Sequence, residues 1–500
     1  MTRTTTKTPT IMFQGTGSSV GKSLIVAGLC RLFYRKGISV APFKPQNMSN
    51  NAAATIDGKE IGRAQALQAI ASNIEPSSLN NPILLKPQTD RGSQLIINGK
   101  YRETVSGFDY QKLKGTLIKT VIDSYNNLSS NYDLILVEGA GSPAEINLRK
   151  GDIANMGFAT ELGIPTLIIG DIDRGGVIAS IVGTNVILSD KDRSNIVGFI
   201  INKFRGDASL FDNGIQEIQK RTSWNFYGLV PFYEDACYLP AEDSHDLDKV
   251  LVNSIDPLRN INIAVPIMNK ISNFDDLDPL RIQKNINLVF VRANQALPED
   301  IDIVLLIGSK STIKDMSELR ANGWDKQIIN FHKKGGIIIG LCGGYQMLGK
   351  SIHDPEKIES LQSKCQGLGL LNITTIMKKD KIIKKVSGRH IQTDSIINGY
   401  EIHLGQTAGP DCSQPLFYLN NRFDGATSAD KRVYGTYLHG FFHNKELIKW
   451  LFNLLDKEIG NSQIIDYGKH LNKNLDNLSD HIEKYINWEQ VLKTSKKYAE

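Results

Sequence analysis

Short apolar runs alternate with longer helix-like segments over most of this 500-residue sequence. Between residues 11 and 232 the runs are IMFQ, ISVAPFK, LILVEG, PTLIIG, IVGFIIN and YGLVPF. A second series begins at INIAVPI and continues through INLVFV, DIVLLIG and GGIIIGLCGG to VYGTYLHGFF. Such alternation is typical of βαβ units built around a parallel sheet. The sequence therefore predicts an α/β fold with two parallel-sheet domains.

The length of the chain agrees with two domains, because 500 residues exceed what one hydrophobic core usually supports. We predict a disordered N-terminus (1–10), a first domain (11–232), an acidic linker with two prolines (233–260) and a second domain (261–445). The remaining residues, 446–500, have helix-spaced apolar positions. We expect them to form C-terminal helices that pack on the second domain and carry no chemistry of their own.

Charge and cysteine content argue against several classes of protein. The balance of 58 basic and 53 acidic side chains gives a net charge of +5, too small an excess to indicate nucleic-acid or membrane partners. Five scattered cysteines without a CxxC pair favour a reducing compartment over a zinc site or a disulfide framework. No apolar stretch approaches the ~18 residues of a membrane span. We therefore expect a cytoplasmic enzyme.

The first predicted strand leads directly into GTGSSVGKS, residues 15–23. In such a loop backbone N–H groups converge on phosphate, Lys22 can reach the outer phosphates, and the Ser23 hydroxyl can hold Mg²⁺. The pattern departs from GxxxxGK[ST], because Thr16 occupies the first glycine position. We interpret it as a variant P-loop that binds a nucleotide; an ordinary glycine-rich turn is the alternative. The glycines of the loop are Gly15, Gly17 and Gly21.

Three other strand ends carry polar side chains that fit a nucleotide site. Glu138 ends LILVE, where ligands bind in open α/β sheets, and it can coordinate Mg²⁺ or remain a solvated acid. Asn202 follows IVGFII, and its amide can contact the adenine edge or belong to a plain turn. In GDIDRGG, Asp171 or Asp173 is either a metal ligand or the N-cap of the next helix.

GIIIGLCGGYQMLG (336–349) has the form strand, sharp turn, helix, with Cys342 at the turn. Small neighbours permit a tight backbone, and N–H groups at a helix start lower a thiol pKa and can bind an oxyanion. We interpret Cys342 as a nucleophile rather than an inert buried residue. His439 in VYGTYLHGFF is the best-placed base, and His403 in GYEIHLG is its competitor. The other cysteines are expected to be inert: Cys30, Cys237, Cys365 and Cys412.

These motifs resemble one family closely. GLCGGYQMLG with YLHGFF resembles the class I glutamine amidotransferase domain of the cobyrinic and cobyric acid amidating enzymes, and GTGSSVGKS with VEGAG resembles their dethiobiotin-synthetase-like ATP domain. The domain order also matches, over roughly residues 9–445. FKPQNMSNNA, EIGRAQALQA, NPILLKP and GYEIHLG are similar to the branch that makes cobyric acid. The a,c-diamide branch should show a Gly-Pro-Asp-Tyr type segment after the second strand, and none is present.

The resemblance implies ATP- and glutamine-dependent amidation of the b, d, e and g carboxylates of adenosylcobyrinic acid a,c-diamide, a step in cobalamin biosynthesis. Glutamine, ATP and a corrinoid would be the small-molecule partners, with Mg²⁺ required and no tightly bound protein cofactor. Neither nucleic acid nor a membrane is expected as a partner, and the oligomeric state is left open. The candidates for corrinoid contact, whose alternative is a polar turn, are Lys44, Gln46, Asn47, Asn50 and Asn51.

The resemblance also carries over Cys342 as the glutaminase nucleophile and His439 as its partner. Ordinary class I glutaminases follow the histidine with Pro-Glu, whereas Gly440 and Phe441 stand here. A Cys–His dyad is therefore expected, and what orients His439 is left open. Two alternatives remain, an a,c-diamide synthase or other ATP-dependent amidotransferase, and a ParA-like nucleotide switch with a degenerate glutaminase domain. The intact Cys342 and His439 argue against the second.

Overall fold

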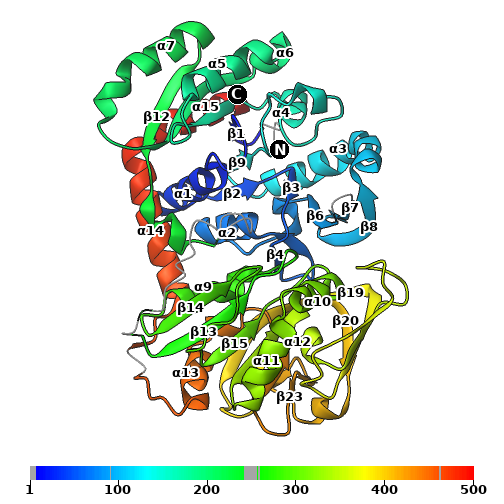
Figure 1. Ribbon diagram of the computed structural model, residues 1–500. Helices are drawn as coiled ribbons and strands as arrows, with labels where there is room; N and C mark the ends of the chain where they lie inside the picture. Colours follow the sequence, from blue (N-terminus) through cyan, green and yellow to red (C-terminus); the bar gives the residue numbers. More distant parts are fainter. Residues whose placement is uncertain (1–6, 90–91, 241–255, 257–258, 461–462) are drawn as a thin grey trace, which may run out of the picture. The chain divides into compact units, whose positions relative to one another are not determined.

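The computed structural model describes residues 7–89, 92–240, 256, 259–460 and 463–500. Within this part the chain divides into two compact units (Figure 1). The first unit contains Met1–Ser49, Lys59–Leu239 and Leu471–Glu500, and the second contains Asn50–Gly58 and Pro240–His470. Neither unit is therefore a single continuous stretch of sequence.

The first unit is built on a six-stranded sheet in the order β12-β11-β10-β1-β9-β2, with every neighbouring pair parallel. Its central strands are buried on both faces, so they read as continuous apolar runs. Because all strands run the same way, their carboxyl ends meet at one edge. The strands are β1 (Thr10–Gly15), β2 (Val40–Phe43), β9 (Leu134–Glu138), β10 (Thr166–Asp171), β11 (Ile196–Phe204) and β12 (Asn225–Pro231).

Helices connect the strands of this sheet as the alternating pattern predicts. The longer ones are α1 (Lys22–Arg35), α2 (Arg63–Ala71), α3 (Gly107–Ser129), α5 (Val177–Ile187) and α7 (Asp212–Thr222). Shorter ones are α4 (Met156–Leu162) and α6 (Asp190–Arg193).

A second sheet in the first unit was not predicted from the apolar pattern. It has the order β3-β6-β7-β8, with bounds Gln46–Met48, Ile83–Thr89, Gly92–Ile97 and Lys100–Ser106. β3 pairs with β6 in parallel, and the rest of the sheet is antiparallel. Strand β3 has only three residues, QNM, and polar residues make up two of them. Such a strand carries no alternation that sequence analysis can detect.

The second unit contains a six-stranded sheet in the order β14-β13-β15-β16-β24-β23. All pairs are parallel except that between β23 and β24. The strands are β13 (Ile261–Pro266), β14 (Ile286–Val291), β15 (Ile303–Leu306), β16 (Ile337–Leu341), β23 (Ala426–Thr427) and β24 (Val433–Thr436). The main helices are α10 (Thr312–Ala321), α11 (Trp324–Lys333), α12 (Gly343–Leu348) and α13 (Lys445–Leu454).

The β-like stretch before VYGTYLHGFF forms a separate, largely antiparallel sheet in the second unit, ordered β18-β17-β19-β21-β22 with β20 paired to β19. Its long hairpin consists of β19 (Thr374–His390) and β20 (Ile396–Ala408). The short strands are β17 (Ser351–His353), β18 (Lys364–Gln366), β21 (Phe417–Leu419) and β22 (Arg422–Asp424). Strand β20 carries the GYEIHLG motif.

The predicted domain boundaries need three corrections. Thr10 already belongs to β1 and is fully buried, so order begins inside the segment predicted to be disordered. Residues 50–58 belong to the second unit although they interrupt the first in sequence. The predicted linker begins with a 3₁₀ helix, Glu234–Tyr238, in the first unit. Residues 1–6 and 241–255 lie outside the described residues.

The prediction that the C-terminal helices pack on the second domain is correct only for α13, whose Leu447 and Trp450 join the core of the second unit. From Leu471 onward, α14 (Tyr467–Tyr485) and α15 (Trp488–Ala499) belong to the first unit. Leu478 and Ile482 of α14 pack against Gly28 of α1 so closely that a Cβ there would meet both. The absence of a side chain at Gly28 therefore allows the two helices to approach.

An ion-pair ladder flanks this apolar seam. Arg31, Arg35 and Lys36 pair with Asp476, Asp480 and Glu483 at 2.7, 2.5 and 2.6 Å. Exposed pairs of this kind contribute little to stability, whereas buried leucine side chains contribute several times more. The apolar seam therefore holds α14 to the first unit.

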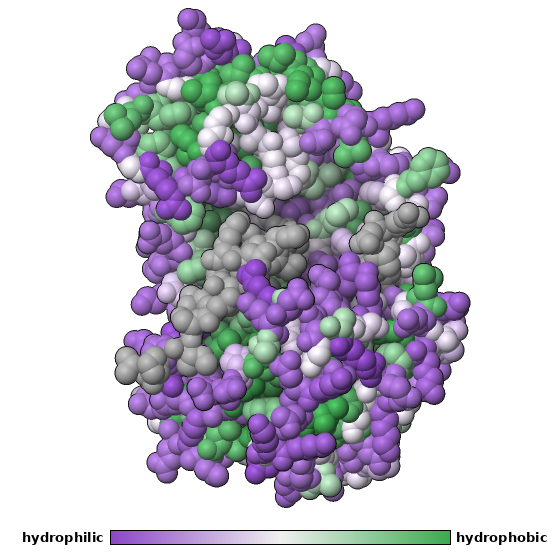
Figure 2. Space-filling model, viewed as in Figure 1, coloured by the Kyte–Doolittle hydropathy of each residue, from purple (hydrophilic) through white to green (hydrophobic). Residues whose placement is uncertain are grey.

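The surface offers no evidence of a membrane-spanning element. Among the described residues, no helix is both long enough and apolar enough to cross a bilayer. Figure 2 shows a largely hydrophilic face on which hydrophobic residues are scattered among polar ones. Scattered apolar residues are ordinary on a folded surface.

Leu478→Ala should lower the free energy of unfolding of the first unit by about 2–5 kcal/mol, because it leaves a cavity against α1. Arg35→Ala should cost no more than about 1 kcal/mol, because its ion pair with Asp480 is exposed to solvent. Denaturant unfolding followed by circular dichroism measures both. Equal losses in the two variants would contradict the dominance of the apolar seam.

Candidate active sites

The predicted P-loop lies between β1 and α1, as the motif requires. Gly21 is the N-cap of α1 and has φ 96°, a left-handed conformation that favours glycine. The ammonium group of Lys22 donates to the carbonyls of Gly17 and Gly141 at 2.9 Å each. Lys22 is therefore held over the loop, with its charge at the carboxyl edge of the sheet.

Glu138 forms a buried polar cluster beside this loop. Its Oε1 accepts hydrogen bonds from the Ser23 hydroxyl (2.7 Å) and the Lys44 ammonium (2.8 Å), and its Oε2 accepts one from Gln68 (2.6 Å). The Lys44 and Glu138 side chains are 4% and 1% exposed. Burying either charge alone would be strongly unfavourable, so each depends on the other. Ser23 and Glu138, both predicted as metal ligands, therefore lie within hydrogen-bond distance.

Asn202 hydrogen-bonds to the P-loop, and its predicted contact with the adenine edge stays a prediction. Its amide nitrogen donates to the Val20 carbonyl at 2.8 Å, and a Cβ on Gly21 would meet this same nitrogen. The amide therefore supports the backbone of the P-loop. Asp171 pairs with Lys203 at 2.7 Å, and Asp173 pairs with Arg205 at 2.8 Å.

Neither aspartate caps the next helix, because Gly176 occupies the N-cap position of α5. The Asp171 carboxylate instead accepts the N–H of Asp173 at 3.0 Å. The expected N-cap role is therefore wrong.

The polar stretch predicted to contact the corrinoid is divided among three surroundings. Lys44 lies beside the P-loop, where it pairs with Glu138. In β3, Gln46 accepts from the Tyr110 hydroxyl at 2.6 Å, and the buried Asn47 donates to Gln65 at 2.8 Å. Asn50 and Asn51 belong to the second unit. The five residues therefore do not form one polar turn.

The buried polar contacts made by EIGRAQALQA and NPILLKP were not predicted from the sequence. Gln65 and Gln68 of the first motif reach Asn47 and Glu138. Glu60 of the first motif and Lys86 of the second form an ion pair at 2.8 Å whose side chains are fully buried. The first motif thus supplies hydrogen bonds to Asn47 of β3 and to Glu138 beside the P-loop. In the sequence, the only signal of these contacts was the pair of glutamines in a largely apolar helix.

Cys342 lies at the turn between β16 and α12, as predicted. It has φ 52° and ψ −105°, a strained conformation for a residue with a side chain. Its N–H donates to the Thr436 carbonyl of β24 at 2.8 Å. Its sulfur lies 3.6 Å from the Ile402 carbonyl of β20. Neighbouring strands thus hold the cysteine in this conformation.

The segment that contains Ser309 lies against the turn that carries Cys342. Ile271 and Ser309 form an antiparallel bridge flanked by the bonds Ser272 N–H to Gly308 O and Lys310 N–H to Lys270 O. In this kind of pair the N–H of Ser309 points away from Ile271. A Cβ on Gly343 would stand 2.6 Å from that nitrogen. The backbone nitrogen of Ser309 therefore lies next to Gly343, the residue that follows Cys342.

A carboxylate orients His439, whose electrostatic neighbours include Cys342. Its Nδ1 lies 2.7 Å from Oδ2 of Asp276, whose Oδ1 accepts the N–H of Gly440, also at 2.7 Å. This pairing assigns the Nδ1 proton to the bond with Asp276 and leaves Nε2 as the ring nitrogen that can exchange a proton with Cys342. The expected dyad is thus corrected to a Cys–His–Asp arrangement, with Asp276 supplied from 163 positions away.

The electrostatics of His439 follow from these neighbours. Burial alone would lower its pKa, but the electrostatic effects of Asp276 and Cys342 and the hydrogen bond to Asp276 raise the pKa to about 10. The imidazole is therefore protonated at neutral pH.

The competitor His403 has other hydrogen-bond and ring partners than His439. Its Nδ1 is 2.7 Å from the Gly405 carbonyl, and its ring stacks on Tyr437 at 3.7 Å. Burial raises the pKa of the Cys30 thiol to about 12, so this cysteine stays protonated. Burial also raises the pKa values of Cys365 and Cys412. Cys237 is exposed. The inert role expected of the four cysteines stays a prediction.

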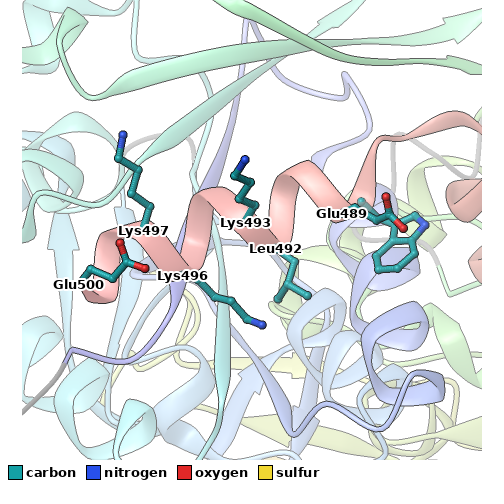
Figure 3. A pocket seen from close by; sticks show the side chains of 7 residues that line it. Glu489, Leu492, Lys493, Lys496, Lys497 and Glu500 are labelled. Atoms are coloured by element: carbon teal, nitrogen blue, oxygen red, sulfur yellow. The ribbon is translucent and has the colours of Figure 1, made fainter.

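One surface hollow involves no predicted site residue. It lies along α15 (Figure 3). Its lining is Trp488, Glu489, Leu492, Lys493, Lys496, Lys497 and Glu500. This hollow is therefore separate from both candidate sites.

Two family models match the chain in the order of the two sites. Residues 11–246 match the CobQ/CobB/MinD/ParA nucleotide binding domain, and residues 262–447 match the CobB/CobQ-like glutamine amidotransferase domain. The cobyric acid synthase of Cereibacter sphaeroides is 48% identical over 96% of this chain and 98% of its own length. That of Rhizobium johnstonii is 49% identical over 95% of this chain and 96% of its own length.

The chain belongs to the cobyric acid synthase family. This membership confirms the resemblance inferred from the motifs and the predicted α/β fold with a P-loop domain followed by a glutamine amidotransferase domain. It also confirms an ATP-dependent glutamine amidotransferase, and so excludes the degenerate nucleotide switch. The roles of individual residues in this family member remain predictions that rest on the geometry above.

Asp276→Asn removes a charge from the site and keeps the shape of the side chain. We expect kcat for glutamine hydrolysis to fall by about 10²- to 10⁴-fold, because the imidazolium loses its partner. The pKa of His439 should fall from about 10 toward its ordinary value. The alkaline limb of the pH–rate profile should therefore move to lower pH.

The control for this variant is Asp430→Asn, which breaks another Asp–His pair in the same unit, that with His332 at 2.8 Å. Its profile should match the wild type.

The folded pKa of His439 lies above its unfolded value of about 6.5. The contribution of the charged His439 to the free energy of unfolding is therefore fully present below about pH 6.5 and is lost as the pH rises through about 10. An unshifted profile in Asp276→Asn would contradict the assignment.

Proposed function

We propose that this chain catalyses the ATP- and glutamine-dependent amidation of the b, d, e and g carboxylates of adenosylcobyrinic acid a,c-diamide, which gives adenosylcobyric acid. The single observation that supports it most is near 48% identity to cobyric acid synthases over almost the whole of both chains. The two sites supply the two half-reactions, release of ammonia and activation of a carboxylate.

Glutamine hydrolysis would use the second unit. The Cys342 thiolate attacks the side-chain carboxamide of glutamine, and the N–H groups of Ser309 and Gly343 stabilise the oxyanion. His439 gives its proton to the departing ammonia, and Asp276 keeps the imidazole in place. His439 then takes a proton from the water that attacks the thioester, which releases glutamate and regenerates the thiolate.

Carboxylate activation would use the first unit. The P-loop amides and Lys22 hold the phosphates of ATP, and a corrinoid carboxylate attacks the γ-phosphorus and releases ADP. Ammonia then attacks the acyl phosphate and displaces inorganic phosphate. Lys44 is placed to neutralise charge on the transferred group, because its ammonium lies in the same cluster as Ser23 and Glu138. Gln46 and Asn47 of β3 remain candidates for corrinoid contact.

Mg²⁺ is part of this proposal. The Ser23 hydroxyl and the Glu138 carboxylate are hard oxygen ligands 2.7 Å apart beside the P-loop, and they fit a cation that takes its other ligands from phosphates and water. Bound there, Mg²⁺ would neutralise phosphate charge. Lys44 shares the same Glu138 oxygen, so the carboxylate has a cationic partner before nucleotide binds.

The nearest alternative is amidation of the a and c carboxylates, and product analysis distinguishes the two. Incubation of cobyrinic acid a,c-diamide with the protein, ATP, Mg²⁺ and glutamine should give four successive mass decreases, each of about one unit. Glutamine labelled with heavy nitrogen in its side-chain amide should label all four new amides. Consumption of cobyrinic acid with two amidations would contradict the proposal.

Cys342→Ala should lower glutamine-dependent amidation by about 10³-fold or more and should retain amidation with high ammonia, because only ammonia release needs the thiolate. Lys22→Ala should abolish both activities, because the phosphates of ATP lose their cation. Product formation with each nitrogen source measures both. Cys365→Ala and Lys36→Ala, which lie outside the proposed sites, are the matched controls.

Full glutamine use by Cys342→Ala would refute the nucleophile assignment. Ammonia-dependent turnover by Lys22→Ala at the wild-type rate would refute the P-loop role.

A further inference from the structure

Residues 50–58 are joined by the chain to strands of the first unit, yet they belong to the second. They follow β3 directly, and Ala52–Ala54 form the short strand β4. Asn51 is fully buried, as is Ala52. A polar residue is buried in this way only where its side chain makes specific hydrogen bonds.

Asn51 hydrogen-bonds to the turn that carries Asp276. Oδ1 of Asn51 accepts the backbone N–H of Asn273 at 3.0 Å. Asn273 in turn donates its side-chain amide to the Ala52 carbonyl at 3.2 Å. Asn51 and Ala52 therefore hold Asn273 by hydrogen bonds to its main chain and to its side chain.

Asn273 determines the geometry of this turn. It adopts a left-handed conformation, φ 55° and ψ 40°, which asparagine tolerates better than most residues. Its carbonyl accepts the N–H of Asp276 at 3.1 Å. A change in the backbone of Asn273 is therefore passed directly to the residue whose carboxylate orients His439.

A second path joins the same turn to His439. The amide of Asn273 donates to the Tyr400 hydroxyl at 3.2 Å, and that hydroxyl lies 3.4 Å from Oδ2 of Asp275. The Tyr400 ring stacks on the His439 imidazole, with centroids 5.2 Å apart and planes at 17°. Tyr400 and His439 also exchange both backbone hydrogen bonds, at 3.1 and 2.8 Å.

We propose that Asn51 is a positioning residue for glutamine hydrolysis, which acts by holding the Asn273–Asp276 turn so that Asp276 and Tyr400 fix the ring of His439. The inference rests on the proposed function of the second unit. It assigns to a residue from the polar stretch FKPQNMSNNA a role in ammonia release, in place of contact with the corrinoid.

The test compares Asn51→Ala with Asn51→Asp in the full-length protein. Alanine removes the acceptor for the Asn273 N–H, whereas aspartate has the same shape and keeps an acceptor oxygen. We expect Asn51→Ala to lower kcat for glutamine hydrolysis by about 10- to 100-fold with little change in KM, because the base is misplaced while the glutamine site is intact. Asn51→Asp should restore most of kcat.

The pH profile separates positioning from a general loss of structure. The ionisable groups facing His439 are Asp276 of the turn, Cys342 at the start of α12 and Tyr400 of β20, with Asp275 beside the tyrosine hydroxyl. A loosened Asp276 stabilises the imidazolium less. The alkaline limb of Asn51→Ala should therefore shift to lower pH, in the same direction as that of Asp276→Asn.

Two further variants keep the test decisive. Tyr400→Phe leaves a ring on His439 but removes the hydroxyl, so it should show a smaller loss in the same direction. Asn287→Ala is the matched control, because Asn287 is a buried asparagine of edge strand β14 that bonds to the Asp256 backbone. Its glutaminase kcat and pH profile should equal those of the wild type.

Wild-type kcat and pH profile in Asn51→Ala would overturn the inference, as would a raised KM with unchanged kcat. Failure of Asn51→Asp to exceed Asn51→Ala would also overturn it. The two proposals fail separately: wild-type protein without glutaminase activity would refute the proposed function and the inference with it, whereas an active wild type with an indifferent Asn51→Ala would refute the inference alone.

Discussion

Both candidate sites depend on the fact that parallel strands end at one edge of their sheet. In the first unit this places the P-loop after β1 beside Glu138 at the end of β9. In the second it places Cys342 after β16 beside the end of β24, whose Thr436 carbonyl holds the cysteine N–H. Chain segments far apart in sequence therefore contribute to one small region without any long-range motif.

Each site then solves the same electrostatic problem, a buried charge that cannot stand alone. Glu138 is balanced by the Lys44 ammonium, and His439 is balanced by Asp276 and Cys342. Removing water strengthens these interactions and makes an unpaired member costly. The same pairing that permits burial also holds the groups in the arrangement that phosphoryl transfer and thiolate attack require.

Local motifs could be interpreted from the sequence because backbone geometry and chemistry there are encoded by adjacent residues. GTGSSVGKS and GLCGGYQ each combine a strand, a turn that needs small residues, and a helix start. Their partners could not be found in this way. Asp276 lies in an acidic stretch with no distinguishing spacing, and Asn51 was predicted either to contact the corrinoid or to belong to a polar turn. The helix-spaced leucines of α14 predicted a buried face but not which unit would cover it.

The sequence alone determined the two α/β domains, their order and the family, and it predicted a nucleophile with its histidine and a P-loop lysine, because each is encoded by a short pattern with a local physical cause. Tertiary structure decided what those residues contact. It gave His439 its aspartate, Glu138 its lysine, and residues 50–58 and 471–500 their units. Such contacts arise when packing closes separate segments onto one another, and the interior accepts only polar groups that find partners there.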